Sequence, residues 1–286
     1  MRLIPKPHLY SFKLFPFLDR VWKLLFYPFS LDPITPHPLS TPSHYYQLHQ
    51  TATLCSYPDV DVLEASASFN IDRDWFNNLA LATQTVIKTS NLSFAHGRVL
   101  YTLLCQYIHS LHSQGILSPL TVFETGTARG FSSLCMAKAL SDMSFCGRIH
   151  TCDVLPHNLP IYWNSISDHT IGRQTRSQLL SEWKELVSST ITFHQCTSVT
   201  FFSSVHTERI HFAFLDAVHT FSAVMSEFRA IQERQLKNDI VVFDDYDAKL
   251  FPGVVKAVNL ISKTYPYNID FISTGHSRFL AVATRI

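Results

Sequence analysis

Three aspartates and one histidine in the second half of the chain could carry out chemistry together. Asp216 follows one apolar run, with His219 three residues later, and Asp244 and Asp245 end the next apolar run. We interpret both runs as neighbouring strands of a parallel sheet, whose carboxyl ends open on one crevice. Clustered carboxylates repel one another and are costly to bury unless a cation neutralises them. Oxygen ligands suit Mg²⁺ or Mn²⁺ better than zinc, so Asp216, Asp244 and Asp245 are predicted metal ligands. The alternative is that Asp244 and Asp245 cap a turn in solvent.

His219 is the candidate general base. It stands at the start of the next predicted helix, so its ring can point into the same crevice. Histidine titrates near neutral pH and is the most frequent general base. Because the chain has 15 histidines, the prediction for His219 rests on its position alone.

A glycine-punctuated turn predicts a cofactor site. Apolar residues lead to Glu124, then Gly126 and Gly130 bracket a turn, and 131–140 has helical composition. Strand, tight turn and helix form half of a nucleotide-binding crevice. The Gly-x-x-x-Gly spacing falls short of the six-residue dinucleotide fingerprint, which favours a cofactor without a pyrophosphate.

An acid ends the second predicted strand. Asp153 closes the run that begins at Arg148. In a Rossmann-like crevice a carboxylate at that position accepts hydrogen bonds from both ribose hydroxyls. We therefore interpret Asp153 as a ribose ligand, the alternative being that it caps the following turn.

The pattern after residue 120 alternates apolar runs with helical stretches, which is typical of a doubly wound parallel sheet. The expected strands lie near 121–126, 148–154, 191–197, 210–217, 239–245, 268–273 and 278–285, and the expected helices at 131–141, 173–187, 220–235 and 253–264. Only four residues separate the last two strands, so they should form an antiparallel hairpin. The predicted fold is a Rossmann-like α/β fold with a seven-stranded, mostly parallel sheet.

The N-terminal part has a different composition. Residues 1–70 are rich in proline, histidine and aromatics and predict a partly irregular arm, whereas 71–118 predicts a cap of two helices before the cofactor domain 119–286. The apolar stretch Val21–Phe29 is too short to span a bilayer. We expect no stable membrane insertion; this stretch would pack on the domain or on a second subunit.

Composition restricts the class of protein. With 46% hydrophobic and 16% charged residues the chain is typical of soluble globular proteins. A net charge of +1 gives no excess that points to nucleic acid. The six cysteines form no CxxC pair, which favours reduced thiols in a cytoplasmic protein.

Together these residues resemble class I S-adenosylmethionine-dependent methyltransferases. The stretch Glu124–Gly130 looks like their methionine-binding motif, and Asp153 looks like their ribose acid. More narrowly, Asp216-Ala-Val-His219, followed by Asp244-Asp245 and Phe251-Pro-Gly-Val, is similar to the macrocin and mycinamicin sugar O-methyltransferase family. The likeness covers about residues 95–286.

The resemblance implies a complete reaction. S-adenosylmethionine would be the cofactor, Mg²⁺ would bind vicinal hydroxyls of a small-molecule or glycan acceptor, and His219 would remove the proton. Some relatives place an acidic base two residues past the first metal aspartate, where this chain has Val218. Related enzymes assemble through N-terminal segments, which implies a homo-oligomer. The implied cofactor-binding residues are Glu124, Gly126, Thr127, Ala128, Gly130, Ser132, Asp153, Thr197, Ser198 and Asp216.

Two other functions stay open on the sequence. One is a hydroxylase-like relative on the same fold, because a fold does not dictate a reaction. The other is a non-catalytic, cofactor-binding interaction protein. A polar, aromatic insertion between Pro156 and Arg176 is long enough to be a lid, in which Tyr162 and Trp163 either stack on a sugar or pack on the domain.

Overall fold

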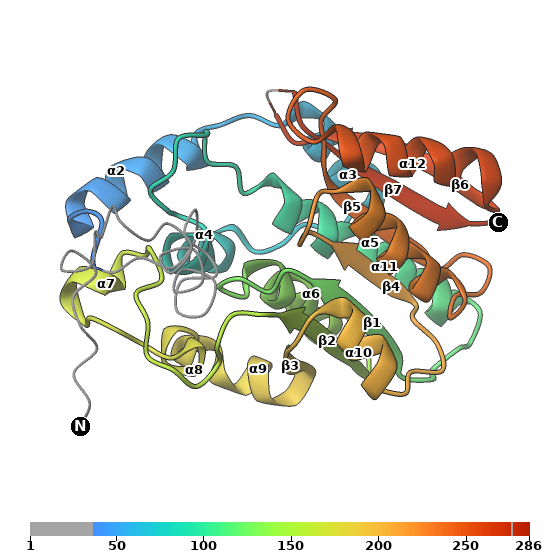
Figure 1. Cartoon of the computed structure of the whole chain (residues 1–286), viewed down its shortest axis with the longest axis horizontal. Helices are drawn as coiled ribbons and strands as arrows, with labels where there is room; N and C mark the ends of the chain where they lie inside the picture. Colours follow the sequence, from blue (N-terminus) through green and yellow to red (C-terminus); the bar gives the residue numbers. More distant parts are fainter. Residues whose placement is uncertain (1–36, 276) are drawn as a thin grey trace, which may run out of the picture.

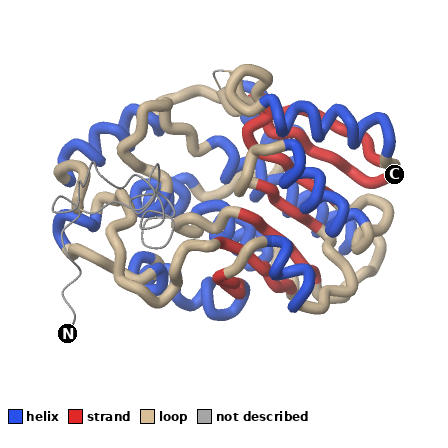
Figure 2. Tube along the Cα trace, in the orientation of Figure 1, coloured by secondary structure: helices blue, strands red, loops and turns tan. Residues whose placement is uncertain are grey.

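A seven-stranded sheet forms the centre of the molecule (Figures 1 and 2). The computed structural model describes residues 37–275 and 277–286, so the apolar stretch near residue 25 lies outside the described residues. The strand order is β3-β2-β1-β4-β5-β7-β6, and all neighbours are parallel except β7, which is antiparallel to β5 and β6. The strands are β1 Leu120–Thr125, β2 Gly147–Asp153, β3 Ile191–Gln195, β4 Phe212–Leu215, β5 Ile240–Tyr246, β6 Tyr267–Ser273 and β7 Phe279–Arg285. The predicted Rossmann-like fold and its C-terminal hairpin are confirmed.

Both faces of the sheet are buried under helices. In β4, Phe212 and Phe214 join one hydrophobic cluster, whereas Ala213 and Leu215 join the other. Strands buried on both faces read as continuous apolar runs, which is why the sequence signal was strong. The first cluster includes α5 (Ala95–Ser113), α6 (Phe131–Asp142) and α9 (Lys184–Thr190), and the second includes α10 (Ser198–Ser204), α11 (Phe221–Gln232) and α12 (Pro252–Thr264).

The helix predicted at 173–187 is wrong as a continuous element. The chain instead forms α8 (Arg176–Leu179), a 3₁₀ turn η2 (Ser181–Trp183) and α9. Leu179 packs in a small cluster with Trp163, whereas the adjacent Leu180 packs in the main core. The segment is therefore divided into three short elements, where helical periodicity alone predicted one continuous helix.

The N-terminal arm, which the sequence predicted to be partly irregular, contains two helices after residue 41. Here the chain forms α2 (Pro42–Thr53) and α3 (Pro58–Ala67), each with proline in its first turn. Proline is favoured there because the first helical N–H groups have no intrahelical partner. Pro42 and Pro58 are therefore helix starts.

Residues 71–118 form two helices, as predicted. Asp72 caps α4 (Arg73–Thr83) by accepting a hydrogen bond from Trp75 N at 2.8 Å. The following helix, α5, is mostly buried and belongs to the helical layer that covers the sheet. Arg98 of α5 donates to the buried Glu64 of α3 at 2.9 Å, which ties the N-terminal helices to this layer.

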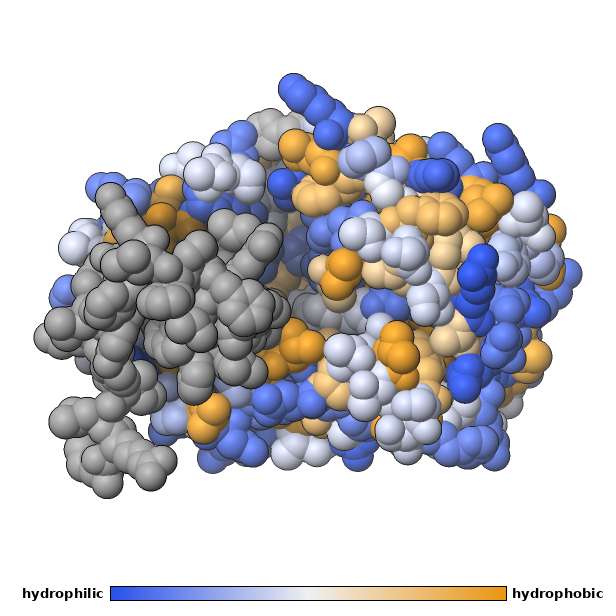
Figure 3. Space-filling model, viewed as in Figure 1, coloured by the Kyte–Doolittle hydropathy of each residue, from blue (hydrophilic) through white to orange (hydrophobic). Residues whose placement is uncertain are grey.

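The described surface is mixed in character. On the face shown in Figure 3, hydrophobic residues are interspersed with hydrophilic ones. Among the residues that the structure describes, no helix combines the length and apolarity needed to cross a membrane.

Candidate functional site

The three predicted acids meet at the carboxyl edge of the sheet. Asp216 follows β4, and Asp244 and Asp245 belong to β5. Their side chains line one cavity of about 160 Å³. The full lining is Gln84, Lys88, Ser93, His96, Asp216, Asp244, Asp245, Thr274 and Arg278. Adjacent parallel strands thus deliver the carboxylates to one place.

His219 joins two of these acids. Its Nε2 atom lies 3.4 Å from Asp216 Oδ1 and 3.6 Å from Asp245 Oδ2, and it is buried without a hydrogen-bond partner. One ligand atom from each of the three residues lies within 4.8 Å of the others. Asp244 stands outside this tight group, and its Oδ1 accepts a hydrogen bond from Asp245 N at 2.7 Å. The tight group therefore contains His219, where the predicted ligand set contained Asp244.

Local packing positions His219. Thr220 caps α11 by accepting from Ala223 N at 3.3 Å, which orients the first turn of the helix that follows the histidine. The ring of Phe251 lies 4.5 Å from the imidazole. A Cβ on Gly253 would lie only 2.5 Å from His219 O, so the start of α12 packs directly on this backbone. The Phe-Pro-Gly segment thus supports the histidine.

The carboxylates strongly influence one another. Burial, then the charges of Asp244 and Asp245, raises the pKa of Asp216 well above its ordinary value. Burial and Asp244 raise the pKa of Asp245 to about 6, although Arg278 Nη1 lies 3.6 Å from Asp245 Oδ1. Full ionisation is thus unfavourable here, and a bound cation would offset it.

The raised pKa of Asp245 predicts that the stability of the folded protein depends on pH. The pKa of Asp245 rises from 3.8 to about 6 on folding, so the folded state binds more protons between these values. The free energy of unfolding should therefore decrease as pH rises through this window. Thermal melts of the metal-free protein at pH 5 and 7.5 measure this loss of stability. The loss between the two pH values should be smaller in the Asp245→Asn variant than in wild type. Equal losses in both proteins would contradict this assignment.

The glycine turn lies against the acidic segment. Gly126 has φ +89°, and a Cβ there would lie 2.0 Å from Asp216 O. Gly130 has φ +87° and precedes α6. Only glycine combines this backbone conformation with such a close approach. The predicted cofactor turn and the acidic cluster are therefore in direct backbone contact.

Gly126→Ala should destabilise the protein more than Gly172→Ala. Both glycines have φ +89°, but nothing lies within 4 Å of a Cβ on Gly172. The left-handed conformation alone costs alanine about 1–2 kcal/mol, and overpacking adds about 1–3 kcal/mol. Denaturant unfolding of the two variants separates these contributions. A Gly126→Ala loss no larger than that of Gly172→Ala would show that the turn tolerates a side chain.

Several predicted cofactor residues stabilise the turn itself. Glu124 is fully buried and accepts hydrogen bonds from the Ser132 and Ser133 hydroxyls. The Thr127 hydroxyl lies 2.5 Å from that of Thr151. These contacts join the end of β1 to the start of α6 and to β2, so they give the turn its shape.

Asp153 lies beside this turn with a partner that sequence reasoning missed. Asp153 Oδ2 accepts a hydrogen bond from Ala128 N at 2.6 Å, and Oδ1 accepts one from Leu155 N at 2.8 Å. Arg176 Nη2 lies 3.7 Å from Asp153 Oδ2. No local motif marks Arg176 in the sequence, because it is separated from Asp153 by the insertion.

The two remaining predicted cofactor-binding residues, Thr197 and Ser198, make other interactions in the structure. Thr197 caps α10, its hydroxyl accepting from Thr200 N at 3.2 Å. Ser198 lines a separate hollow of about 290 Å³ beside Glu227. Capping explains Thr197 without a ligand, so its predicted cofactor contact stays a prediction.

Trp163 packs inside the insertion. It is fully buried, its Nε1 donates to Gln174 O at 2.8 Å, and it clusters with Leu155 and Leu179. This geometry favours the packed alternative over stacking on a sugar. Tyr162 is half-buried with the Arg173 guanidinium 5.3 Å from its ring.

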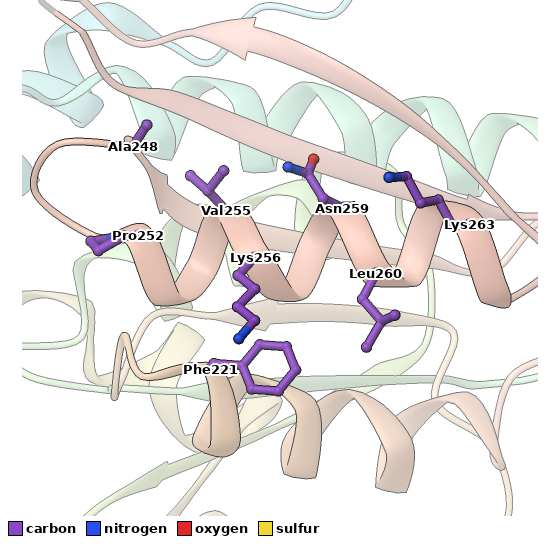
Figure 4. Close-up of a pocket in the computed structure, with 8 residues that line it drawn as sticks. All are labelled: Phe221, Ala248, Pro252, Val255, Lys256, Asn259, Leu260 and Lys263. Atoms are coloured by element: carbon purple, nitrogen blue, oxygen red, sulfur yellow. The ribbon is translucent and has the colours of Figure 1, made fainter.

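A second hollow, of about 460 Å³, lies between α11 and α12 (Figure 4). Lys256 points from α12 toward the ring of Phe221, 4.9 Å away. The lining is Phe221, Ala248, Pro252, Val255, Lys256, Asn259, Leu260 and Lys263. It contains no acid, histidine or cysteine, so it lacks the groups that the predicted chemistry requires.

Comparison with known proteins identifies the domain. Residues 123–246 match the family model described as a methyltransferase domain. This segment runs from β1 to the end of β5 and contains the glycine turn, Asp153, His219 and all three acids of the cavity. No curated protein matches the sequence.

The solved structures that are similar to this chain have low sequence identity to it. The O-methyltransferase TomG from Streptomyces achromogenes, involved in tomaymycin synthesis and solved with S-adenosylmethionine, is 16% identical, with a TM-score of 0.51 over 79% of this chain and 96% of that one. An O-methyltransferase from Bacillus cereus in complex with S-adenosylhomocysteine is 13% identical, with a TM-score of 0.43 over 94% and 97%. An rRNA methylase from Streptococcus thermophilus is 10% identical, with a TM-score of 0.44 over 66% and 95%. Residues 123–246 of this chain therefore match a methyltransferase domain, and the chain shares the Rossmann-like methyltransferase fold of TomG.

Proposed function

We propose that this protein transfers the methyl group of S-adenosylmethionine to a hydroxyl of a sugar or another vicinal diol, assisted by Mg²⁺ or Mn²⁺. The observation that carries the proposal is the convergence of Asp216, His219 and Asp245 within 4.8 Å, in backbone contact with the Gly126 turn. A methyl donor held at the turn and an acceptor held at the acids would be neighbours.

The residues fit a hard divalent cation. Three carboxylates line the cavity, burial raises the pKa of each, and His219 Nε2 is buried without a partner. Asp216 and Asp245 would hold the cation with Asp244 or His219 beside them. When bound, such a cation neutralises the acids, orients the two oxygens of a diol and lowers the pKa of the reacting hydroxyl.

The chain's own groups would do the rest. His219 Nε2 faces the acids and would accept the hydroxyl proton as the oxygen attacks the methyl group. Asp216 joins the two halves of the site, because its side chain lines the acidic cavity and its backbone carbonyl abuts Gly126. Holding the two reactants in near-attack geometry would contribute several kcal/mol, and the glycine turn would set the position of the donor.

Calorimetry tests the proposal directly. S-adenosylmethionine is titrated into the protein with Mg²⁺ or with a chelator, and methyl transfer from labelled donor is measured over a panel of sugars, glycosylated metabolites and other vicinal diols. We expect donor binding, and turnover that chelation removes and Mg²⁺ restores. The variant Asp270→Asn, an exposed acid on β6, is the control and should keep wild-type metal dependence.

Two outcomes would change the proposal in different ways. Absence of donor binding would remove the methyltransferase function. Turnover that persists under chelation would keep methyl transfer but eliminate the metal, and Arg278, 3.6 Å from Asp245, would then be the counter-charge.

A further inference from the structure

The acidic cavity also contains two cationic side chains. Lys88, from the segment between α4 and α5, and Arg278, from the turn between β6 and β7, line it beside the three acids. The other lining residues are polar as well, namely Gln84, Ser93, His96 and Thr274. Among the described residues that line this cavity there is no phenylalanine, tyrosine or tryptophan. An acceptor would therefore be recognised here by charge and hydrogen bonds, with no aromatic ring to stack on.

Arg278 has hydrogen-bond donors to offer a ligand. A guanidinium carries five N–H donors, yet that of Arg278 makes no hydrogen bond with the described residues. Its Nη1 atom lies 3.6 Å from Asp245 Oδ1, an ion pair too long for a hydrogen bond, and its side chain is 26% exposed. Arginine binds carboxylates through two parallel N–H···O bonds. Arg278 is thus the lining residue whose geometry matches a carboxylate.

The turn that carries Arg278 is held in place by its neighbours. Thr274 N and the Thr274 hydroxyl both donate to Arg278 O, at 3.0 and 3.3 Å. Ser93 Oγ donates to Thr274 O at 3.1 Å, and Asp59 Oδ2 of α3 accepts from Ser273 N at 3.0 Å. The backbone of Arg278 is therefore fixed relative to α3 and to the segment before α5.

The charges of the cavity favour an anionic acceptor once a divalent cation is bound. Three carboxylates face the two cationic side chains. Burial and the positive charges of Lys88 and Arg278 lower the pKa of His96 to about 3, so its ring adds no charge. With a divalent cation held by ionised carboxylates, the lining would carry one net positive charge. A carboxylate would balance this charge, whereas a phosphate monoester would bring about 1.5–2 negative charges.

We propose that the acceptor is an acidic sugar or another vicinal diol that carries a carboxylate, and that Arg278 binds this carboxylate with Lys88 beside it. The diol oxygens would lie at the acids and the carboxylate at the turn between β6 and β7. The cavity of about 160 Å³ is smaller than the roughly 300–1,000 Å³ of sites for drug-sized ligands, so it would enclose one ring of the acceptor. This inference rests on the proposed function and narrows its substrate class.

The test compares acceptors that differ in one charged group. D-glucuronate is paired with D-glucose, D-galacturonate with D-galactose and D-mannuronate with D-mannose, and each is titrated calorimetrically into protein that holds Mg²⁺ and S-adenosylhomocysteine. We expect wild type to bind the acid of at least one pair about 10- to 100-fold more tightly than its neutral partner, the usual effect of hydrogen bonds to a charged group. Arg278→Gln should reduce this preference to less than about threefold, with the affinity for the neutral sugar almost unchanged.

Two further variants show what the arginine contributes. Arg278→Lys keeps the charge but loses the planar fork, so its preference for the acid should lie between those of wild type and Arg278→Gln. The matched control is Arg148→Gln, an exposed arginine at the start of β2, on the opposite edge of the sheet. This variant should keep the wild-type preference.

Several outcomes would overturn the inference. Equal weakening of acid and neutral sugar in Arg278→Gln would mean that the arginine only balances the charge of the acids. Tighter binding of glucose 6-phosphate than of glucuronate would replace the carboxylate by a phosphate. If Arg278→Gln does not fold, wild type alone decides, because the absence of a preference in every pair excludes an anionic acceptor. Failure of wild type to bind S-adenosylhomocysteine would overturn the proposed function as well, which is distinguishable from donor binding without a preference for acids.

Discussion

Alanine in place of His219 is expected to lower kcat by about 10²–10⁴-fold, the usual contribution of a general base. Its Nε2 lies 3.4 Å from Asp216 and 3.6 Å from Asp245, so it faces the point where the acceptor hydroxyl would be held. Affinity for S-adenosylmethionine should stay within about threefold of wild type. Among the described residues, the imidazole of His219 makes no hydrogen bond or ring contact with the glycine turn. Steady-state kinetics with labelled donor measure the change.

Two further measurements separate a base from a metal ligand. If His219 is the base, the pH profile of kcat should lose its acidic limb in His219→Ala, while the Kd of Mn²⁺ stays unchanged. If His219 is a ligand, the Kd of Mn²⁺ should rise in the same variant. The exposed His206 provides the matched control, and His206→Ala should behave as wild type in both assays. A fully active His219→Ala enzyme would place the base elsewhere.

Asp245→Asn should lower the turnover of the enzyme and raise the melting temperature of the metal-free protein. The position has φ +54°, a left-handed conformation that asparagine adopts as readily as aspartate, so the backbone should not change. Loss of one cation ligand should lower turnover about 10²–10³-fold, since metal catalysis is worth several kcal/mol. The metal-free variant should nevertheless melt about 2–4 °C higher at pH 7.5, as relief of like-charge repulsion worth about 1 kcal/mol would do.

Calorimetry with Mn²⁺ and thermal melts check both parts. Asp244→Asn should also weaken metal binding, whereas Asp270→Asn, on the exposed face of β6, should change neither quantity. A lower melting temperature for metal-free Asp245→Asn would mean that its contacts with Arg278 and His219 outweigh the repulsion from Asp244. Unchanged turnover would exclude Asp245 from the catalytic site.

Some features of the glycine turn could be predicted from the sequence because they are local. Gly126 and Gly130 adopt positive φ angles that few other residues tolerate, so glycine at these positions is itself a structural signal. The position of Asp153 could be predicted for the same reason, since this residue ends a strand beside that turn. The rule that parallel strands open on one crevice then predicted that Asp216 and Asp245 would lie together.

Other predictions from the sequence were wrong because the residue pattern was compatible with more than one structure. The prolines at 42 and 58 begin helices, although proline also marks irregular segments. The stretch 173–187 was predicted as one helix, yet it forms α8, a 3₁₀ turn and the start of α9, with Leu179 and Leu180 packed in different clusters. Composition cannot distinguish these cases, since the choice depends on which neighbours are present.

The sequence by itself determined the seven strands, their hairpin ending and the glycine turn, because each depends on a run of neighbouring residues with one periodicity or one backbone requirement. Only the tertiary structure decided that His219, rather than Asp244, has a ligand atom within 4.8 Å of those of Asp216 and Asp245, and that Arg176 lies beside Asp153. These contacts join residues that are far apart along the chain or that differ only in where the side chain points. Distances of a few ångströms between such groups are set by the packing of whole elements, which no local pattern encodes.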